Sequence, residues 1–208
     1  MQDLIQAFNH FPALFISSVA LLSLLIGSFL NVVIYRLPKM MEQEWQQEYQ
    51  QYFNPEHSAD VPATFNLATP RSRCPSCNAL VTARDNIPVL SWLLLKGKCR
   101  SCTAPISARY PLIETLTALM SAVVAWQLGF GLAAGVVIVI TWSLIALTFI
   151  DIDKMLLPDQ LTLPLLWLVL LFSLTDSAFV NPAQAIVGAA AGYLSLWSVY
   201  WLFKLLTG

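Results

Sequence analysis

Residues 115–150 read TLTALMSAVVAWQLGFGLAAGVVIVITWSLIALTFI and contain no charged side chain. As a single helix this stretch would be about 54 Å long, whereas the hydrocarbon core of a bilayer is about 30 Å thick. The chain must therefore turn back, and the turn is predicted at the glycines of Gly129-Phe130-Gly131. We expect one membrane pass near residues 111–128 and a second near residues 131–150.

Three further apolar stretches lie on either side of this pair. Residues 12–35 are long enough to cross the bilayer as one helix. No positively charged region precedes them and no small-residue cleavage site follows, so they are not a secretory signal peptide. Residues 160–175 and 177–203 give two more spans, of which the first is short and carries Pro164 near its start.

The composition supports this pattern. Hydrophobic residues make up 57% of the 208 and charged residues only 11%, whereas soluble domains have roughly 45–50% and about 25%. The net charge of −1 argues against a nucleic-acid-binding protein. The sequence therefore predicts an all-α polytopic membrane protein with about five transmembrane helices, in contact with the lipid bilayer.

The basic residues predict which side of the membrane the long loop occupies. Nine of the eleven Lys and Arg residues lie between Arg36 and Arg109, so the positive-inside rule makes this loop cytoplasmic. We expect three regions: residues 1–36 with the first transmembrane helix, residues 37–110 as a small cytoplasmic zinc-binding loop domain, and residues 111–208 with four further transmembrane helices.

The zinc prediction rests on the cysteines, all of which fall in two CxxC pairs: Cys74, Cys77, Cys99 and Cys102. Two such pairs separated by about twenty residues are typical of a tetrahedral thiolate site. The alternative is disulfides, but a cytoplasmic loop is reducing, and so small a domain needs a metal to fold. Four sulfur ligands leave no open position for water, so the zinc is expected to be structural.

Residues 149–159, FIDIDKMLLPD, place three carboxylates at the inner end of the third span. Charged groups at a membrane boundary are costly unless they are solvated or functional. Asp159 precedes the fourth span and suits a helix N-cap, and Asp153 beside Lys154 suits a solvated ion. Asp151 is the first to emerge from the apolar run, and we predict that it is the most desolvated and the catalytic one.

Aspartic-protease chemistry needs a second carboxylate, because two carboxyl groups share one proton. Asp151 and Asp153 are about 200° apart if the helix continues, so they cannot converge. Asp176 is expected on the opposite side of the membrane. Glu114 could reach the site, but a pair with Arg109 or Arg36 is the plainer prediction.

Six segments together resemble the type IV prepilin leader peptidases, the membrane aspartic proteases that process type IV pilins and type II secretion pseudopilins. They are residues 27–38 (GSFLNVVIYRLP), 71–77 (RSRCPSC), 86–92 (NIPVLSW), 98–102 (KCRSC), 106–111 (ISARYP) and 151–153 (DID). The resemblance covers nearly the whole chain, and Asp151 matches the first catalytic aspartate of the family.

This resemblance implies a multi-pass protein of the bacterial inner membrane. Its members cleave a prepilin or pseudopilin after a Gly on the cytoplasmic side and then methylate the new N-terminal Phe with S-adenosylmethionine. No Gly-rich loop of the βαβ type predicts where S-adenosylmethionine binds.

Members of this family carry the second catalytic aspartate in a GxGD motif, shortly after a stretch like residues 201–208. This sequence stops at Gly208. It is therefore similar to a member truncated at the C-terminus, and we expect little peptidase activity from the chain alone. The alternative function is a non-catalytic membrane protein that binds pilin-like helices without cutting them.

Overall fold

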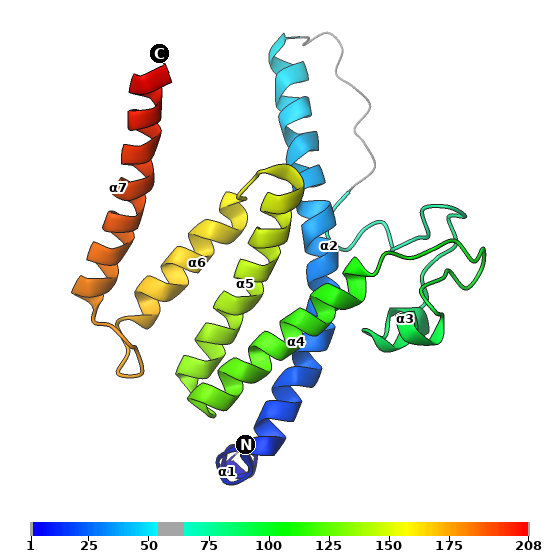
Figure 1. The fold of residues 1–208 in the computed structure, drawn as a ribbon, viewed down its shortest axis with the longest axis horizontal. Coiled ribbons are helices and arrows are strands. Elements are labelled where there is room, and N and C mark those ends of the chain that lie inside the picture. Colours follow the sequence, from blue (N-terminus) through cyan, green and yellow to red (C-terminus); the bar gives the residue numbers. More distant parts are fainter. Residues whose placement is uncertain (1, 54–64, 208) are drawn as a thin grey trace. The chain divides into compact units, whose positions relative to one another are not determined.

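A computed structural model describes residues 2–53 and 65–207, so residues 54–64 of the predicted loop domain lie outside the described residues. The described part is helical, with two isolated antiparallel bridges and no strand (Figure 1). The all-α class is confirmed. The elements are α1 (Gln2–His10), α2 (Pro12–Phe53), the 3₁₀ turn η1 (Ala83–Asn86), α3 (Leu90–Leu94), α4 (Arg109–Leu128), α5 (Leu132–Lys154), α6 (Asp159–Phe172) and α7 (Pro182–Thr207).

Four helices of the described chain are long and apolar enough to cross a membrane, namely α2, α4, α5 and α7. The fourth predicted span is α6, which has only 14 residues. At 1.5 Å per residue it is about 21 Å long, less than the thickness of the hydrocarbon core. The structure therefore supports a multi-pass membrane protein with four full-length spans and one short apolar helix.

Helix α2 extends much further than the predicted first span. It has 42 residues, or about 63 Å at 1.5 Å per residue, so it cannot lie within the bilayer over its whole length. It begins at Pro12, as suits a residue with no N–H to pair in the first turn. It continues through the buried Pro38 into the polar residues beyond.

The predicted reversal between the two central spans is confirmed. Helix α4 ends at Leu128 and α5 begins at Leu132. Gly129 has φ of 66°, a conformation that suits glycine. Between the two glycines, Phe130 packs against Phe8 and Phe15, with ring centroids 5.4 Å apart in both pairs. An aromatic cluster therefore joins this turn to α1 and to the start of α2.

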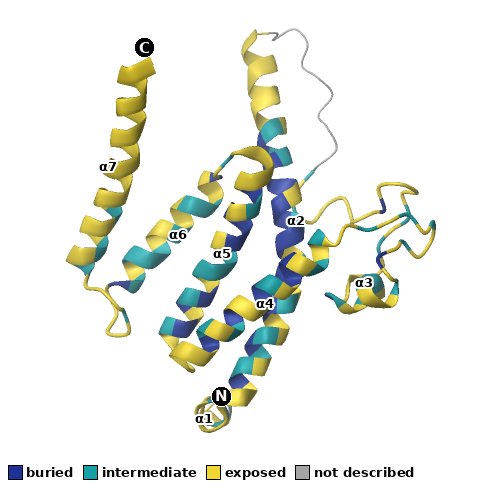
Figure 2. Cartoon of the chain, in the orientation of Figure 1, coloured by how far each residue is buried: buried dark blue, intermediate teal, exposed yellow. Residues whose placement is uncertain are grey.

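The chain divides into two compact units, Met1–Leu161 and Thr162–Gly208. In the first unit α2, α4 and α5 form a three-helix core, visible as the dark blue faces in Figure 2. One end of this core is built around Phe15, Val19 and Ile138, and the other around Ile34, Ile113 and Ile150. These facing apolar stripes fix the end of α5 that carries the predicted catalytic aspartate.

The second unit contains nearly all of α6 and the whole of α7. Asn181 caps α7, because its Oδ1 accepts the N–H of Gln184 at 2.9 Å and its own N–H donates to Gln184 Oε1 at 3.3 Å. The α7 residues are mostly exposed (Figure 2). Near its end the Lys204 ammonium lies 5.0 Å from the Trp201 ring, a combination that suits a membrane interface.

Candidate functional site

The four cysteines converge as the sequence predicts. Their sulfur atoms all lie within 4.8 Å of one another, and the sulfurs of Cys74 and Cys102 are 3.8 Å apart. A disulfide needs about 2.05 Å between sulfurs, and all four cysteines are free. Tetrahedral zinc at about 2.3 Å from each sulfur requires sulfurs about 3.8 Å apart. The donor set and its spacing therefore fit one zinc ion.

Each CxxC pair is built by the same backbone turn. Asn78 N–H donates to Cys74 O, and Cys74 N–H donates to Ala79 O, both at 2.9 Å. The second pair repeats these bonds at 3.0 and 2.8 Å, from Thr103 to Cys99 and from Cys99 to Ala104. The repeat was readable in the sequence as [R/K]-C-x-S-C-x-A at residues 73–79 and 98–104, a signal that the sequence analysis missed.

The pKa values of two of the cysteine thiols are shifted in opposite directions. Backbone N–H groups, first that of Cys77 and then that of Ser76, lower the pKa of the Cys74 thiol to about 6. For Cys102 the Ala104 N–H acts in the same direction, but the Cys77 thiol, desolvation and the other two thiols outweigh it and raise the pKa to about 12. Deprotonating all four thiols of this cluster therefore requires a cation that balances their charge.

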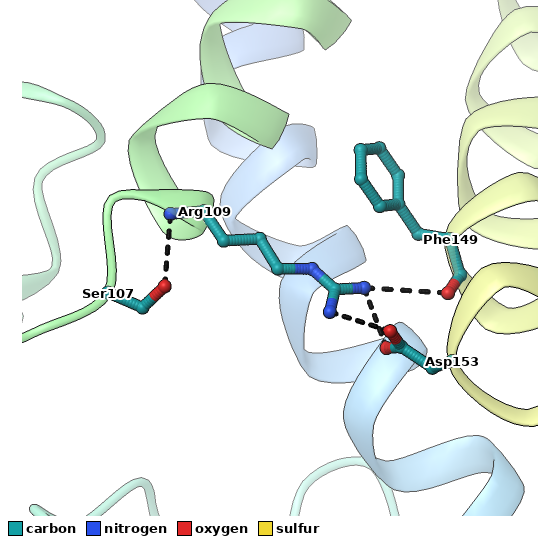
Figure 3. Close-up of polar contacts among 4 residues, drawn as sticks. All are labelled: Ser107, Arg109, Phe149 and Asp153. Carbon is teal, nitrogen blue, oxygen red and sulfur yellow. Dashed lines mark hydrogen bonds and ion pairs between the residues drawn. The ribbon is translucent and has the colours of Figure 1, made fainter.

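The second candidate site is the inner end of α5, where the predicted roles of the carboxylates change. Arg109, at the start of α4, holds Asp153 through two hydrogen bonds of 2.8 and 2.6 Å (Figure 3). Its guanidinium also lies 5.1 Å from the Phe149 ring. Asp153 is exposed, as predicted for a solvated ion, but its partner is Arg109 rather than solvent alone. Lys154, the residue beside it, pairs with Glu42 at 2.7 Å.

Glu114 is the buried carboxylate of this region, with 7% of its surface exposed. Its Oε2 accepts the N–H of Val89 at 2.7 Å, so the predicted pair with Arg109 or Arg36 is wrong. Arg36 instead donates to the carbonyl oxygens of Asn66 and Pro70 at 2.9 and 2.6 Å.

Val89 itself has an unusual backbone. Its φ of 60° and ψ of −49° are rare for a β-branched residue. The N–H of Leu90 donates to Pro88 O at 2.5 Å, which closes a three-residue γ-turn of the strained, positive-φ type. The sequence carried no signal for this turn. Glu114 thus ties a strained turn of the loop that carries the four cysteines (residues 65–108, called the cysteine loop below) to a membrane helix.

Asp151 is exposed, as are Asp153 and Asp159. The protein's own packing therefore does not desolvate Asp151, and the prediction that it is the most desolvated carboxylate fails, because Glu114 is the buried one. Helix α5 continues to Lys154, so the prediction that Asp151 and Asp153 point apart is confirmed. Asp159, the predicted N-cap, is the first residue of α6.

Gly27 is where α2 and α4 cross most closely. A Cβ at this position would lie 2.7 Å from Glu114 Cα and 3.2 Å from Thr117 Cβ. Next to the crossing, Asn31 Nδ2 donates to Tyr110 O at 3.2 Å and fixes α2 against the start of α4. The glycine therefore sets how closely Glu114 approaches α2.

We expect Gly27→Ala to destabilise the protein by roughly 1–3 kcal/mol, because the clash is with backbone and the two helices must separate. The measurement is the unfolding midpoint of the purified chain in detergent. Gly135→Ala in α5 is the matched control, since a Cβ there meets no atom within 4 Å. Equal midpoints for Gly27→Ala and the unaltered chain would contradict the close crossing.

Comparison with known proteins shows the family to which the chain belongs. Residues 21–128 match the bacterial peptidase A24 N-terminal domain, and residues 138–207 match the type IV leader peptidase family. The chain is 59% identical over 208 residues, all of its length and 71% of the relative's, to a prepilin leader peptidase/N-methyltransferase of Aeromonas hydrophila. It is 50% identical over 197 residues to the protein of that name in Pseudomonas aeruginosa, covering 95% and 67% of the two chains. No solved structure matches.

Proposed function

This chain belongs to the type IV leader peptidase family, and from that membership we propose that it is an aspartic endopeptidase that processes prepilins. Its substrates are type IV prepilins or type II secretion pseudopilins, from which it removes the leader before methylating the new N-terminal residue. The observation that carries the proposal is the 59% identity across all 208 residues to a relative with both activities in its name.

Asp151 is the proposed catalytic residue. It lies in the last turn of α5, next to the point where the helix ends at Lys154. No ion pair holds it within the described residues, whereas Asp153 is bound by Arg109. An exposed, unpaired carboxylate is able to take a proton from water while that water attacks a peptide carbonyl. The second carboxylate that this chemistry needs is not assigned, because Asp153 and Glu114 are both already bound.

Arg109 is proposed to position this site. Its bidentate bond to Asp153, together with a 3.4 Å contact from its guanidinium to Phe149 O, joins the start of α4 to the last turns of α5 (Figure 3). A planar guanidinium holds a carboxylate in one orientation, which lysine does not do. The orientation of the last turn of α5, and with it that of Asp151, follows from this bond.

The metal is proposed to be zinc, held by Cys74, Cys77, Cys99 and Cys102, with a structural role. Zinc supplies the cross-link that lets a small loop domain fold, and four sulfur ligands leave no position for a catalytic water. For methyl transfer, S-adenosylmethionine is the proposed donor because of the relatives' name. No described residue can be assigned to bind it.

The proposed location is the bacterial inner membrane, with the cysteine loop in the cytoplasm. Nine of the eleven basic residues lie in that loop and its flanks, and basic loops are retained on the cytoplasmic side. The substrate would then present its leader on the same side as Asp151, which lies at the end of α5 nearest the loop.

The experiment is a two-step assay with the purified chain, a prepilin and S-adenosylmethionine. The proposal predicts that mass spectrometry detects the released leader and then a gain of one methyl group on the mature N-terminus. The expectation from the sequence, little peptidase activity from this chain alone, predicts neither change in appreciable amount. Omitting S-adenosylmethionine is expected to abolish only the second change. A chain that binds the prepilin in detergent without releasing the leader would contradict the proposed peptidase.

A further inference from the structure

The short helix α3 exposes an apolar surface that no described residue covers. Leu90, Leu93 and Leu94 are 51, 58 and 73% exposed, and their spacing places them on one face of the helix. Ile87, just before the helix, is also exposed. We call these four residues the leucine face.

The other side of α3 is packed against its own loop. Trp92 Nε1 donates to Ile106 O at 3.1 Å, and the Trp92 ring lies so close to Gly97 that a Cβ there would be 2.9 Å from it. Gly97 N–H also donates to Trp92 O at 2.9 Å. The orientation of α3 on the loop is therefore fixed, and the leucine face is directed away from it.

The depth of α3 follows from its attachment to α4. Arg109 and Asp153 form the charged pair at the start of α4 and the end of α5. Glu114 lies five residues further into α4, about 7.5 Å along the helix. Because Val89 N–H is bonded to Glu114, the start of α3 lies beside α4 between one and two turns past that charged pair, further into the candidate membrane span.

Basic residues flank the leucine face in the sequence. Arg84, Lys96 and Lys98 are exposed, and none forms an ion pair within the described residues. The nearby acidic residue, Asp85, is already bound by Arg100 at 2.6 Å. Apolar side chains with unpaired cations beside them are the pattern of segments that lie in the membrane interface, where lysine reaches the headgroups.

We propose that the leucine face is inserted into the boundary between headgroups and acyl chains of the bilayer that the helices cross. Lys96 and Lys98 then contact anionic headgroups, whose negative surface attracts basic residues. Lipid is the molecule that covers the leucine face. The turn that begins α3 is held further into the membrane than the Arg109–Asp153 pair, beside a membrane-spanning helix. The cysteine loop is thus attached to the membrane at a third point, in addition to α2, which precedes it, and α4, which follows it.

The test uses the full chain in vesicles of phosphatidylcholine with about one quarter phosphatidylglycerol. A genetically encoded fluorescent amino acid replaces Leu94, and the lipids carry bromine near the top of the acyl chain. The matched control carries the same fluorophore at Leu80, which is 49% exposed on the first CxxC turn. We expect about threefold stronger quenching by brominated lipid at position 94 than at position 80, as for an inserted segment.

Two variants extend the test. Leu90→Glu with Leu93→Glu is expected to remove the lipid quenching at position 94 and to speed tryptic cleavage after Lys96, while Leu80→Glu does neither. Lys96→Gln is expected to reduce the dependence of the quenching on phosphatidylglycerol. Quenching of position 94 by aqueous iodide in the unaltered loop would overturn the proposal, because the face would then lie in water. Shielding from both quenchers would overturn it too, because protein would then cover the face.

Discussion

Cys99→Ser is expected to abolish stoichiometric zinc binding and to unfold the loop between residues 71 and 106. The sulfur cluster has four ligands within 4.8 Å, and structural zinc contributes roughly 10–16 kcal/mol to the folding of small domains. The described part of this domain has two CxxC turns, two isolated bridges, the 3₁₀ turn η1 and the five-residue α3, and none of these contributes a stabilising term of that size. The measurements are zinc content by elemental analysis and protease sensitivity of the loop.

The matched control is Ser101→Ala, an exposed residue between the two ligands of the second pair. It is expected to keep about one zinc per chain, as a four-ligand site does. Acidification should release the metal from the unaltered protein, since thiolates must be deprotonated to bind it. Full zinc content in Cys99→Ser would show that Cys99 is not a ligand.

Asp151→Asn is expected to lower prepilin cleavage by on the order of 10⁴-fold, the scale for loss of one member of a catalytic group. An amide cannot take the proton of the attacking water, and the geometry of α5 is otherwise kept, since no ion pair of Asp151 is lost. The readout is kcat for leader release, measured beside zinc content and unfolding midpoint, both of which should stay unchanged.

Asp153→Asn and Asp159→Asn are the controls. They test whether the loss of cleavage is specific to Asp151 or follows the removal of any carboxylate in this segment. Asp153→Asn weakens the bond to Arg109 and is expected to lower stability as well as cleavage. Asp159→Asn is expected to lower cleavage much less than Asp151→Asn. If Asp151→Asn cleaves within about tenfold of the unaltered chain, Asp151 is not the catalytic carboxylate.

Features that depend on local sequence were predictable. The reversal at Gly129-Phe130-Gly131 follows from the length of one charge-free stretch, because a helix has a fixed rise per residue. The four cysteines follow from their spacing, because each CxxC turn presents two sulfurs by itself. The continuation of α2 to Phe53 was missed, because its polar end looked like the start of the loop domain, although Pro38 does not stop the helix.

The sequence by itself thus determined the helical membrane fold, the central turn and the cluster of four cysteines that could hold a metal ion. Only the tertiary structure decided the partners of the charged groups, because those partners lie far apart in the chain. Arg109 and Asp153 are separated by 44 residues, and Val89 and Glu114 by 25. Charge alone allowed Glu114 to pair with either arginine. In the structure Glu114 is buried beside the close crossing at Gly27, and the backbone N–H of Val89 donates to it.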